Sequence, residues 1–367
     1  MLALDVPVFG LCRTALGYLL VPGAALSDLR PRLAGLTEWG PVDTLGRLSR
    51  RVPRPRARAE ADLRRCAVGR CLRTGLAALA RRHLPLGTAY LNVGHSNLSQ
   101  RTFAQLADAG LPIGVLVHDT IPLDHPQTQR PGTVDRFAKR MGVVERFADV
   151  IITTAAATQA AIATQLSPRK AQFVTAHLGV TLATPATATP APQPPYFLCV
   201  GTIDPRKNQG LLLDVWEDLT RRMGPKAPPL VLAGSRGWGD AALMQRLDRL
   251  SSGPVIEMPG LTDAEMAGLL EGATALLHPS TAEGFGFPVI EAALRGIPII
   301  CHDLPVFREL VGDIPVYVSS TEMYHWGNAV DDLLNGGDNE QTQKQDGAQR
   351  PHHPTWDSHL ATVLTAI

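Results

Sequence analysis

The stretch HPSTAEGFGFPVIEAALRGIPII, His278 to Ile300, runs from the end of an apolar segment through a glycine-rich turn into a helical pattern. Pro288 suits the first position of a helix, because the N–H that it lacks would be unpaired there. Gly284 and Gly286 allow the backbone to approach a ligand closely, since a Cβ would intrude. The N–H groups of such a turn and the positive end of the helix can face an anion such as a nucleotide diphosphate. The stretch therefore predicts a strand–turn–helix unit with an anion site at the turn.

Short apolar runs alternate with helical patterns on both sides of this stretch. The expected strands before it are Thr88–Val93, Pro112–Val117, Val150–Thr153, Tyr196–Val200, Pro229–Ala233 and Val255–Met258. Ala273–His278 leads into it, and Pro298–Cys301 overlaps its end. This alternation predicts an α/β protein with parallel, doubly wound sheets. Ligands in such sheets bind beyond the carboxyl ends of the strands.

A Pro/Ala/Thr-rich segment without charge, Thr181–Pro195, divides the chain and is typical of an extended linker. We therefore expect an N-terminal Rossmann-like domain over 1–180, the linker over 181–195, and a C-terminal ligand-binding domain over 196–345. The last part, 346–367, combines a polar segment expected to be a mobile loop with a terminal helix from Trp356.

Composition narrows the classes of function. The chain has 367 residues and a formal net charge of +1, so no global field favours nucleic acid as a partner. Its five cysteines show neither a disulfide framework nor zinc-ligand spacing, which favours a reducing compartment. Asp5 and Arg13 interrupt the apolar start, which argues against a signal peptide or a membrane span. We expect a cytoplasmic protein whose chain begins with a buried strand followed by a helix.

Arginines crowd the region from Arg47 to Arg82. The simpler interpretation is a solvated helical face with a loop, because charge runs are usually solvated. The alternative is a patch that contacts anionic lipid headgroups at the inner face of a membrane, or a phosphorylated acceptor.

Two carboxylates flank the glycine turn, Glu283 inside the loop and Glu291 one turn into the helix. A carboxylate that accepts two neighbouring hydroxyls is a common anchor for a sugar or a ribose. Each glutamate taken alone suits a solvated position near a helix start. Their combination with the glycines in a strand–turn–helix context favours a binding role.

A second strand end carries GTIDPRKNQGLLL, Gly201 to Leu213. Asp204-Pro205 suits a turn, and Arg206 and Lys207 follow it at the mouth of the sheet. Two cations there can neutralise a diphosphate leaving group as its charge develops. An exposed basic pair on a loop is the alternative, and the position at the carboxyl end of a strand favours the first interpretation.

In the N-terminal half, His118 and Asp119 follow a buried strand in VLVHDTIPLDHP, Val115 to Pro126. His118 is positioned to contact a ligand across a cleft. Asp119 either caps the turn or acts as a base on an acceptor hydroxyl, and the sequence does not separate these roles. His95, which follows Gly94 at another strand end, is a candidate for the acceptor side, and a structural role is the alternative.

These residues resemble the family 4 retaining glycosyltransferases, whose GT-B fold places two Rossmann-like domains face to face across a cleft. Glu283 and Glu291, with seven residues between them, match the paired glutamates of that family, and Arg206 and Lys207 match its donor-phosphate pair. His118 matches a histidine that contacts the donor sugar. The similarity is strongest over Tyr196–Leu310 and looser over Leu91–Val180.

The resemblance implies retaining transfer of a hexose from a nucleotide diphosphate-sugar, without a metal or other cofactor. Glu283 would contact the sugar hydroxyls, Glu291 the ribose, and the backbone of Gly284, Phe285 and Gly286 the sugar and phosphate. Gly201 and Thr202 would complete the donor site. The terminal helix would cross back to the first domain.

The HDTIP segment, His118 to Pro122, resembles bacterial mannosyltransferase-like members that build surface polysaccharides. It suggests GDP-mannose as the donor and a glycan or lipid-linked acceptor. The first sixty residues match poorly and lack the family's early glycine-rich loop. A nucleotide-sugar-binding protein with weakened catalysis is therefore the alternative. A Rossmann dehydrogenase is disfavoured, because no G-x-G-x-x-G follows a strand.

Overall fold

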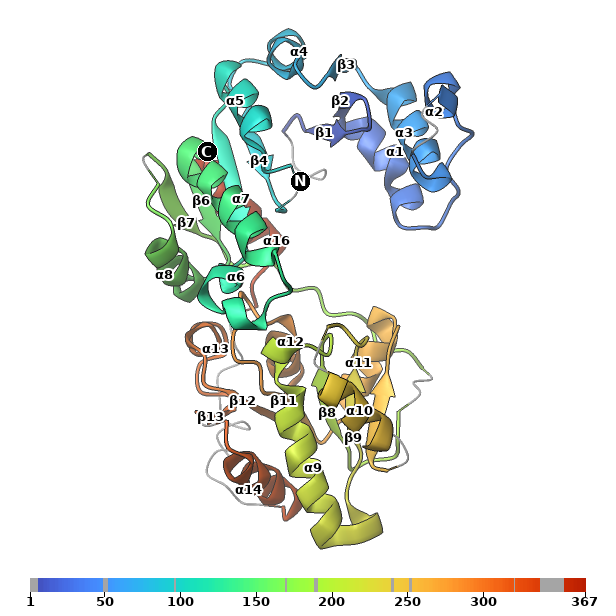
Figure 1. Cartoon of the computed structure of the whole chain (residues 1–367), viewed down its shortest axis with the longest axis vertical. Coiled ribbons are helices and arrows are strands. Elements are labelled where there is room, and N and C mark those ends of the chain that lie inside the picture. The colour runs from blue at the N-terminus through green and yellow to red at the C-terminus, as the bar shows by residue number, and fades with distance from the viewer. Residues whose placement is uncertain are drawn as a thin grey trace.

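The computed structural model describes residues 6–48, 52–95, 97–168, 170–187, 191–238, 241–250, 253–319, 321–336 and 353–367. Two α/β halves follow each other along the molecule, with an N-terminal arm of strands and helices projecting from the first (Figure 1). Three sheets organise the described residues: an antiparallel sheet in the arm and one parallel sheet in each half.

The C-terminal sheet is parallel, with the strand order β10-β9-β8-β11-β12-β13. Its strands are β8 (Phe197–Val200), β9 (Leu230–Ala233), β10 (Val255–Met258), β11 (Ala275–His278), β12 (Ile299–His302) and β13 (Val316–Val318). The order reverses between β8 and β11, and such a switch point is where doubly wound sheets bind ligands. The two chemistry-bearing stretches of the sequence follow these two neighbouring strands.

Helices and two short 3-10 turns connect these strands. They are η2 (Pro205–Lys207), α9 (Gln209–Met223), η3 (Gly224–Lys226), α10 (Ala241–Leu250), α11 (Asp263–Gly272), α12 (Phe287–Arg295), α13 (Pro305–Val311) and α14 (Met323–Leu334). Thr262 caps α11, since its hydroxyl accepts from the Glu265 N–H while the Glu265 carboxylate accepts from the Thr262 N–H. The strands β9 and β11 are buried along their whole length, which suits the continuous apolar runs of a sheet covered on both faces.

The parallel sheet of the N-terminal half has the order β4-β5-β6-β7, which follows the chain. Its strands are β4 (Tyr90–Asn92), β5 (Ile113–Val117), β6 (Val150–Thr153) and β7 (Gln172–Thr175). The helices are α4 (Leu76–His83), α5 (Gln100–Asp108), α6 (Ile121–Asp124), η1 (Pro126–Thr128), α7 (Thr133–Phe147) and α8 (Ala156–Gln165). One apolar cluster joins this half to the other, because Ala155 and Ala176 belong to the same buried group as Phe285 and Val306.

The N-terminal arm corrects one expectation. In place of a single strand followed by a helix, β1 (Phe9–Arg13) and β2 (Gly17–Pro22) form a hairpin, and β3 (Gly69–Leu72) pairs with β2. The turn explains the difference, because Thr14 Oγ1 accepts from the Gly17 N–H and donates to its carbonyl. Gly17 is also needed for sheet pairing, since a Cβ there would lie 2.0 Å from the Cys71 carbonyl oxygen.

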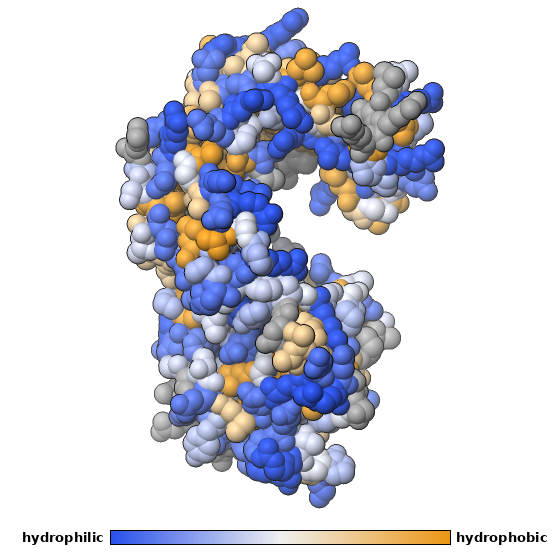
Figure 2. Space-filling view, viewed as in Figure 1, coloured by the Kyte–Doolittle hydropathy of each residue, from blue (hydrophilic) through white to orange (hydrophobic). Residues whose placement is uncertain are grey.

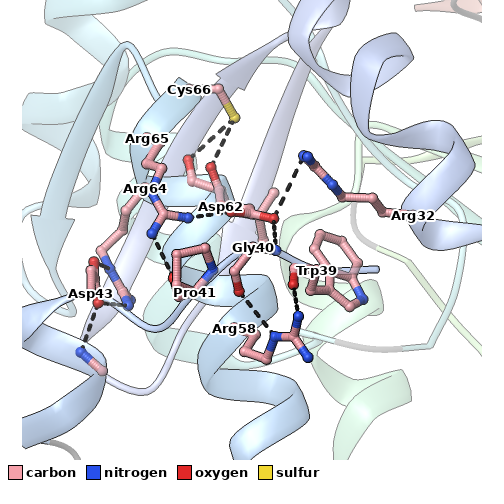
Figure 3. Close-up of polar contacts among 12 residues, drawn as sticks. Arg32, Trp39, Gly40, Pro41, Asp43, Arg58, Asp62, Arg64, Arg65 and Cys66 are labelled. Atoms are coloured by element: carbon pink, nitrogen blue, oxygen red, sulfur yellow. Dashed lines mark hydrogen bonds and ion pairs between the residues drawn. The ribbon is translucent and has the colours of Figure 1, made fainter. Parts of the chain in front are cut away.

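Three helices complete the arm: α1 (Gly23–Leu33), α2 (Thr44–Leu48) and α3 (Arg54–Cys66). Their charged side chains form a network (Figure 3). Arg64 donates to both carboxylate oxygens of Asp43 at 2.7 and 2.8 Å, and the buried Asp62 accepts from Arg65 and from the Gly40 N–H. Arg58 donates to the carbonyls of Trp39 and Gly40. Part of the Arg47–Arg82 charge is therefore neutralised within the arm, and membrane contact through the remainder stays a prediction.

The chain returns to the N-terminal half at its end. Helix α16 (Trp356–Ala366) packs beside β7, and His359 Nδ1 lies 3.1 Å from the Ala176 carbonyl oxygen (Figure 1). The close approach requires Gly179, where a Cβ would lie 2.3 Å from the Trp356 nitrogen. Within the last part, 346–367, residues 346–352 of the segment expected to be a mobile loop lie outside the described residues.

Within the described ranges, no helix combines the length and the apolar character needed to cross a lipid bilayer. In the expected linker, the Ala183 carbonyl accepts from Arg295 of α12 at 2.6 Å, and the Ala186 N–H donates to the Ala264 carbonyl. This segment is thus held against the C-terminal half.

Candidate active site

The loop after β8 is built by Asp204. Its carboxylate accepts from the backbone N–H groups of Arg206 and Lys207 at 3.0 and 3.2 Å, and Pro205 starts the short turn η2. Asn208 then adopts the left-handed conformation with φ of 54°, which ends the turn and starts α9. The sequence of this loop therefore fixes the backbone from which both cationic side chains extend.

The turn after β11 relies on Gly286. This residue is the N-cap of α12 with φ of 84°, and a Cβ there would lie 2.3 Å from the Phe307 ring. The helix begins at Phe287, so Pro288 stands at the second helical position and not at the first as predicted. Proline is tolerated there because the first N–H groups of a helix have no partner within it.

Glu283 is the centre of the site. Its side chain is 9 % exposed and forms ion pairs with Lys207 and, at 3.1 Å, with Arg206. Burial would raise the pKa of Glu283, but the hydrogen bond from His278 and the charges of Lys207 and Arg206 outweigh it and hold this pKa well below its usual range. A carboxylate and two cations from two neighbouring loops thus meet at the switch point of the sheet.

His278 is a site residue that sequence reasoning missed. It ends β11, is 1 % exposed, and its Nε2 lies 3.0 Å from Glu283 Oε1. Burial lowers the pKa of His278, so the neutral imidazole donates an Nε2 proton to the carboxylate. A polar residue at the last position of a buried strand, five residues before Glu283, was the available signal.

The N-terminal half reaches this turn through His118 and Asp119. A Cβ on Gly284 would lie 2.5 Å from the His118 carbonyl oxygen, so the two backbones are in close contact. Asp119 caps its own turn, since its carboxylate accepts from the Ile121 N–H at 3.1 Å, and burial raises its pKa. This favours the capping role over the alternative, and the role as a base stays a prediction.

His95 and His118 form a pair in the N-terminal half. Their rings meet edge to face with centroids 5.6 Å apart, and His118 Nε2 lies 3.3 Å from the Val93 carbonyl oxygen. Burial, and then the neighbouring His118, lower the pKa of His95 to about 4. Its buried Nε2 has no hydrogen-bond partner in the described part of the chain.

Two more buried polar atoms lie in the segments that follow strands β8 and β11 of the C-terminal sheet. Ser280 Oγ and Gln209 Oε1 are without a hydrogen-bond partner among the described residues, although both side chains are only 1 % exposed. Buried polar groups are nearly always paired, so unpaired ones in one region indicate a place where a polar ligand can bind. Gln209 Nε2 meanwhile donates to the Thr202 carbonyl, beside Gly201, at 3.1 Å.

A cavity of about 200 Å³ lies between the two halves, with walls that include Asp119 and His125 on one side and Glu283 and Pro305 on the other. The molecule is also hollowed on a larger scale, between the arm and the C-terminal half (Figure 2). A larger groove of about 640 Å³ lies away from Glu283, among apolar residues of the N-terminal half such as Leu79, Leu86 and Val93.

Glu291 does not join the Glu283 cluster. It is half-buried on α12, where burial raises its pKa against the opposing effect of Arg295. Gly201 is close to the cluster, since a Cβ there would lie 3.4 Å from Lys207 Cε. Phe285 is buried and packs edge to face against Phe287, so its side chain anchors the turn in the core. Across the described ranges, no three His, Cys, Asp or Glu side chains are grouped to hold a metal ion.

Solved structures share the fold of this chain. Anabaena Alr3699/HepE, crystallised with UDP-glucose, matches with a TM-score of 0.59 and 17 % identity, covering 79 % of this chain and 80 % of that one. TarM matches with a TM-score of 0.57 and 13 % identity over 83 % of this chain and 60 % of the other. The fold is GT-B. The fold predicted from the sequence is thereby confirmed.

Comparisons of sequence agree with the fold. Residues 185–350 match the family model "Glycosyl transferases group 1". The serotype-specific mannosyltransferase WbdA of Escherichia coli is 28 % identical over 241 residues, which cover 60 % of this chain and 29 % of that protein. The O-antigen chain mannosyltransferase B of Escherichia coli is 36 % identical over 119 residues, 32 % of this chain and 31 % of that protein. The chain thus spans about a third or less of these two relatives.

Proposed function

We propose that this protein is a retaining glycosyltransferase that moves a hexose from a nucleotide diphosphate-sugar to a glycan or lipid-linked acceptor. One observation carries the proposal: Arg206, Lys207 and Glu283 converge at the switch point of the C-terminal sheet. The region that matches the glycosyltransferase family model includes all three residues. No metal or other cofactor enters the proposal.

In this proposal the two cations act on the leaving group. A diphosphate that enters beside Glu283 can be contacted by Arg206 and Lys207, whose side chains are 22 % and 13 % exposed. As the bond to the sugar breaks, negative charge grows on the diphosphate, and preorganised cations stabilise it more than the ground state. Glu283, kept ionised by its neighbours, accepts hydrogen bonds from the sugar hydroxyls.

The proposed sugar rests on the names of relatives, and the proposed acceptor rests on an apolar groove. GDP-mannose is the favoured donor, supported by relatives that are named mannosyltransferases. The apolar groove of about 640 Å³ in the N-terminal half supports an acceptor with an apolar part, as a lipid-linked glycan has. A longer apolar tail on the acceptor should then lower its KM, and equal KM values for short and long tails would count against this assignment.

The first experiment is a thermal-shift screen with GDP, UDP, ADP and their sugars, followed by a transfer assay with the donor that binds. Losing a preorganised charge from the transition state costs about 3 kcal/mol, or about 100-fold in kcat. We expect the Arg206→Ala/Lys207→Ala variant to show at least this loss. Arg222→Ala is the matched control, because Arg222 pairs with Asp218 on the outer surface of the same half. Near-normal turnover of the double variant would exclude the proposed role.

A second candidate is a nucleotide-sugar-binding protein with weakened catalysis. The β1–β2 hairpin near the start of the described residues favours it, because this region lacks the early glycine-rich loop that the family resemblance leads one to expect. Calorimetry, which measures donor binding, and the transfer assay, which measures the products, together separate the two candidates. Donor binding without transfer and without slow donor hydrolysis supports the second, and product formation with retained anomeric configuration supports the first.

A further inference from the structure

Helix α8 of the N-terminal half begins without a cap of its own. Its N-cap residue is Ala155, whose side chain offers no acceptor, whereas helices usually begin with Ser, Thr, Asp or Asn. The N–H groups of Ala156 and Ala157 donate instead to Oε1 and Oε2 of Glu309, both at 2.8 Å. Glu309 lies on α13, so the C-terminal half supplies the cap.

The same helix start holds the glycine turn of the site. Thr154 Oγ1 and Thr158 Oγ1 lie 2.8 and 2.7 Å from the Gly284 carbonyl oxygen and donate to it. Both threonines are buried. Because Gly284 directly follows Glu283, two hydroxyl groups from one half fix the backbone that carries the central carboxylate of the other.

A third group completes the junction. His177, which follows β7, places its Nε2 2.9 Å from Glu309 Oε1. Burial would raise the pKa of Glu309, but the Ala156 and Ala157 N–H groups and His177 outweigh it and lower this pKa. The Glu309 carboxylate therefore stays charged. A negative charge is favoured there because it lies at the positive end of helix α8.

We propose that Glu309 is a positioning residue: by capping α8 from the opposite half, it holds Thr154 and Thr158 against the Gly284 carbonyl and thereby fixes the turn that carries Glu283. Its effect on sugar transfer rests on the proposed function. The coupling of the helix start to the glycine turn does not, and this difference shapes the experiment.

Hydrogen–deuterium exchange of the full chain tests the coupling directly. In Glu309→Ala, we expect the amides of Ala156 and Ala157 to exchange about tenfold faster, as for the loss of a typical N-cap. The amides from Glu283 to Phe287 should also exchange faster. Glu217→Ala is the matched control, because Glu217 pairs with Arg246 on the outer side of the C-terminal half. Faster exchange at α8 with an unchanged glycine turn would overturn the proposal, as would no change at either.

A second variant keeps the cap intact. Thr154→Val/Thr158→Val removes only the two hydroxyl groups, so the glycine turn should exchange faster while the Ala156 and Ala157 amides keep their protection. An unchanged glycine turn in this variant contradicts the proposal. In the transfer assay, Glu309→Ala should lower kcat about 100-fold, the scale expected for a misplaced reacting group. Glu309→Gln, which keeps one acceptor oxygen, should recover part of this loss. If the wild-type chain transfers no sugar, the proposed function fails while exchange still decides the coupling.

Discussion

Replacing Gly284 by alanine tests the contact between the two halves. The added Cβ would lie 2.5 Å from the His118 carbonyl oxygen, whereas such contacts essentially never fall below 3.0 Å, so the backbones must separate by at least 0.5 Å. The two nearest atoms to this Cβ, the His118 carbonyl oxygen and Asp119 Cβ at 3.1 Å, belong to a turn and cannot rotate away as the end of a flexible side chain can.

The same shift strains the hydrogen bonds to the Gly284 carbonyl. Bonds of 2.8 and 2.7 Å from Thr154 and Thr158 would lengthen to at most 3.3 and 3.2 Å if the turn retreats by 0.5 Å. Each hydrogen bond contributes about 0.5–1.5 kcal/mol, and overpacking costs about 1–3 kcal/mol. We therefore expect Gly284→Ala to lower the free energy of unfolding by about 1–3 kcal/mol and to lower kcat about 100-fold, as for a displaced reacting group.

Urea unfolding and the transfer assay measure the two effects. Gly142→Ala is the control, because Gly142 lies in α7 with nothing within 4 Å of an added Cβ, and this change should stabilise the chain by about 0.5–1 kcal/mol. Wild-type stability and wild-type kcat in Gly284→Ala would refute the close approach of the Gly284 and His118 backbones.

Two further predictions concern pH. The hydrogen bond from Arg64 is the main cause that lowers the pKa of Asp43 from 3.8 to about 2, so Asp43 adds stability above pH 3.8 that is lost as the pH falls to 2. The stability gap between wild type and Asp43→Asn should therefore be constant near neutral pH and shrink toward pH 2; a gap independent of pH contradicts the ion pair. Burial lowers the pKa of His95 from 6.5 to about 4, so the folded chain favours the neutral ring. The stability that the neutral His95 ring contributes is therefore complete above pH 6.5 and is lost as the pH falls toward 4. Ring-proton NMR should show this midpoint, and a midpoint near 6.5 would mean that the ring is solvated.

The sequence by itself determined the elements that depend on local pattern. The strand Val150–Thr153 begins and ends as expected, because a short apolar run of this length suits a strand buried on both faces. The edge strand Val255–Met258, which includes Glu257 and is mostly half-buried, also keeps its expected bounds. The meeting of Arg206 and Lys207 with Glu283 could also be predicted, since the carboxyl ends of neighbouring parallel strands lie at one edge of the sheet.

Only the tertiary structure decided which groups meet across the two halves. The cap that Glu309 gives to α8 joins segments far apart in the chain, and its geometry depends on how α13 packs against the N-terminal half. Periodicity and turn chemistry act over a few residues, whereas these contacts arise from the burial of one apolar cluster shared by both halves.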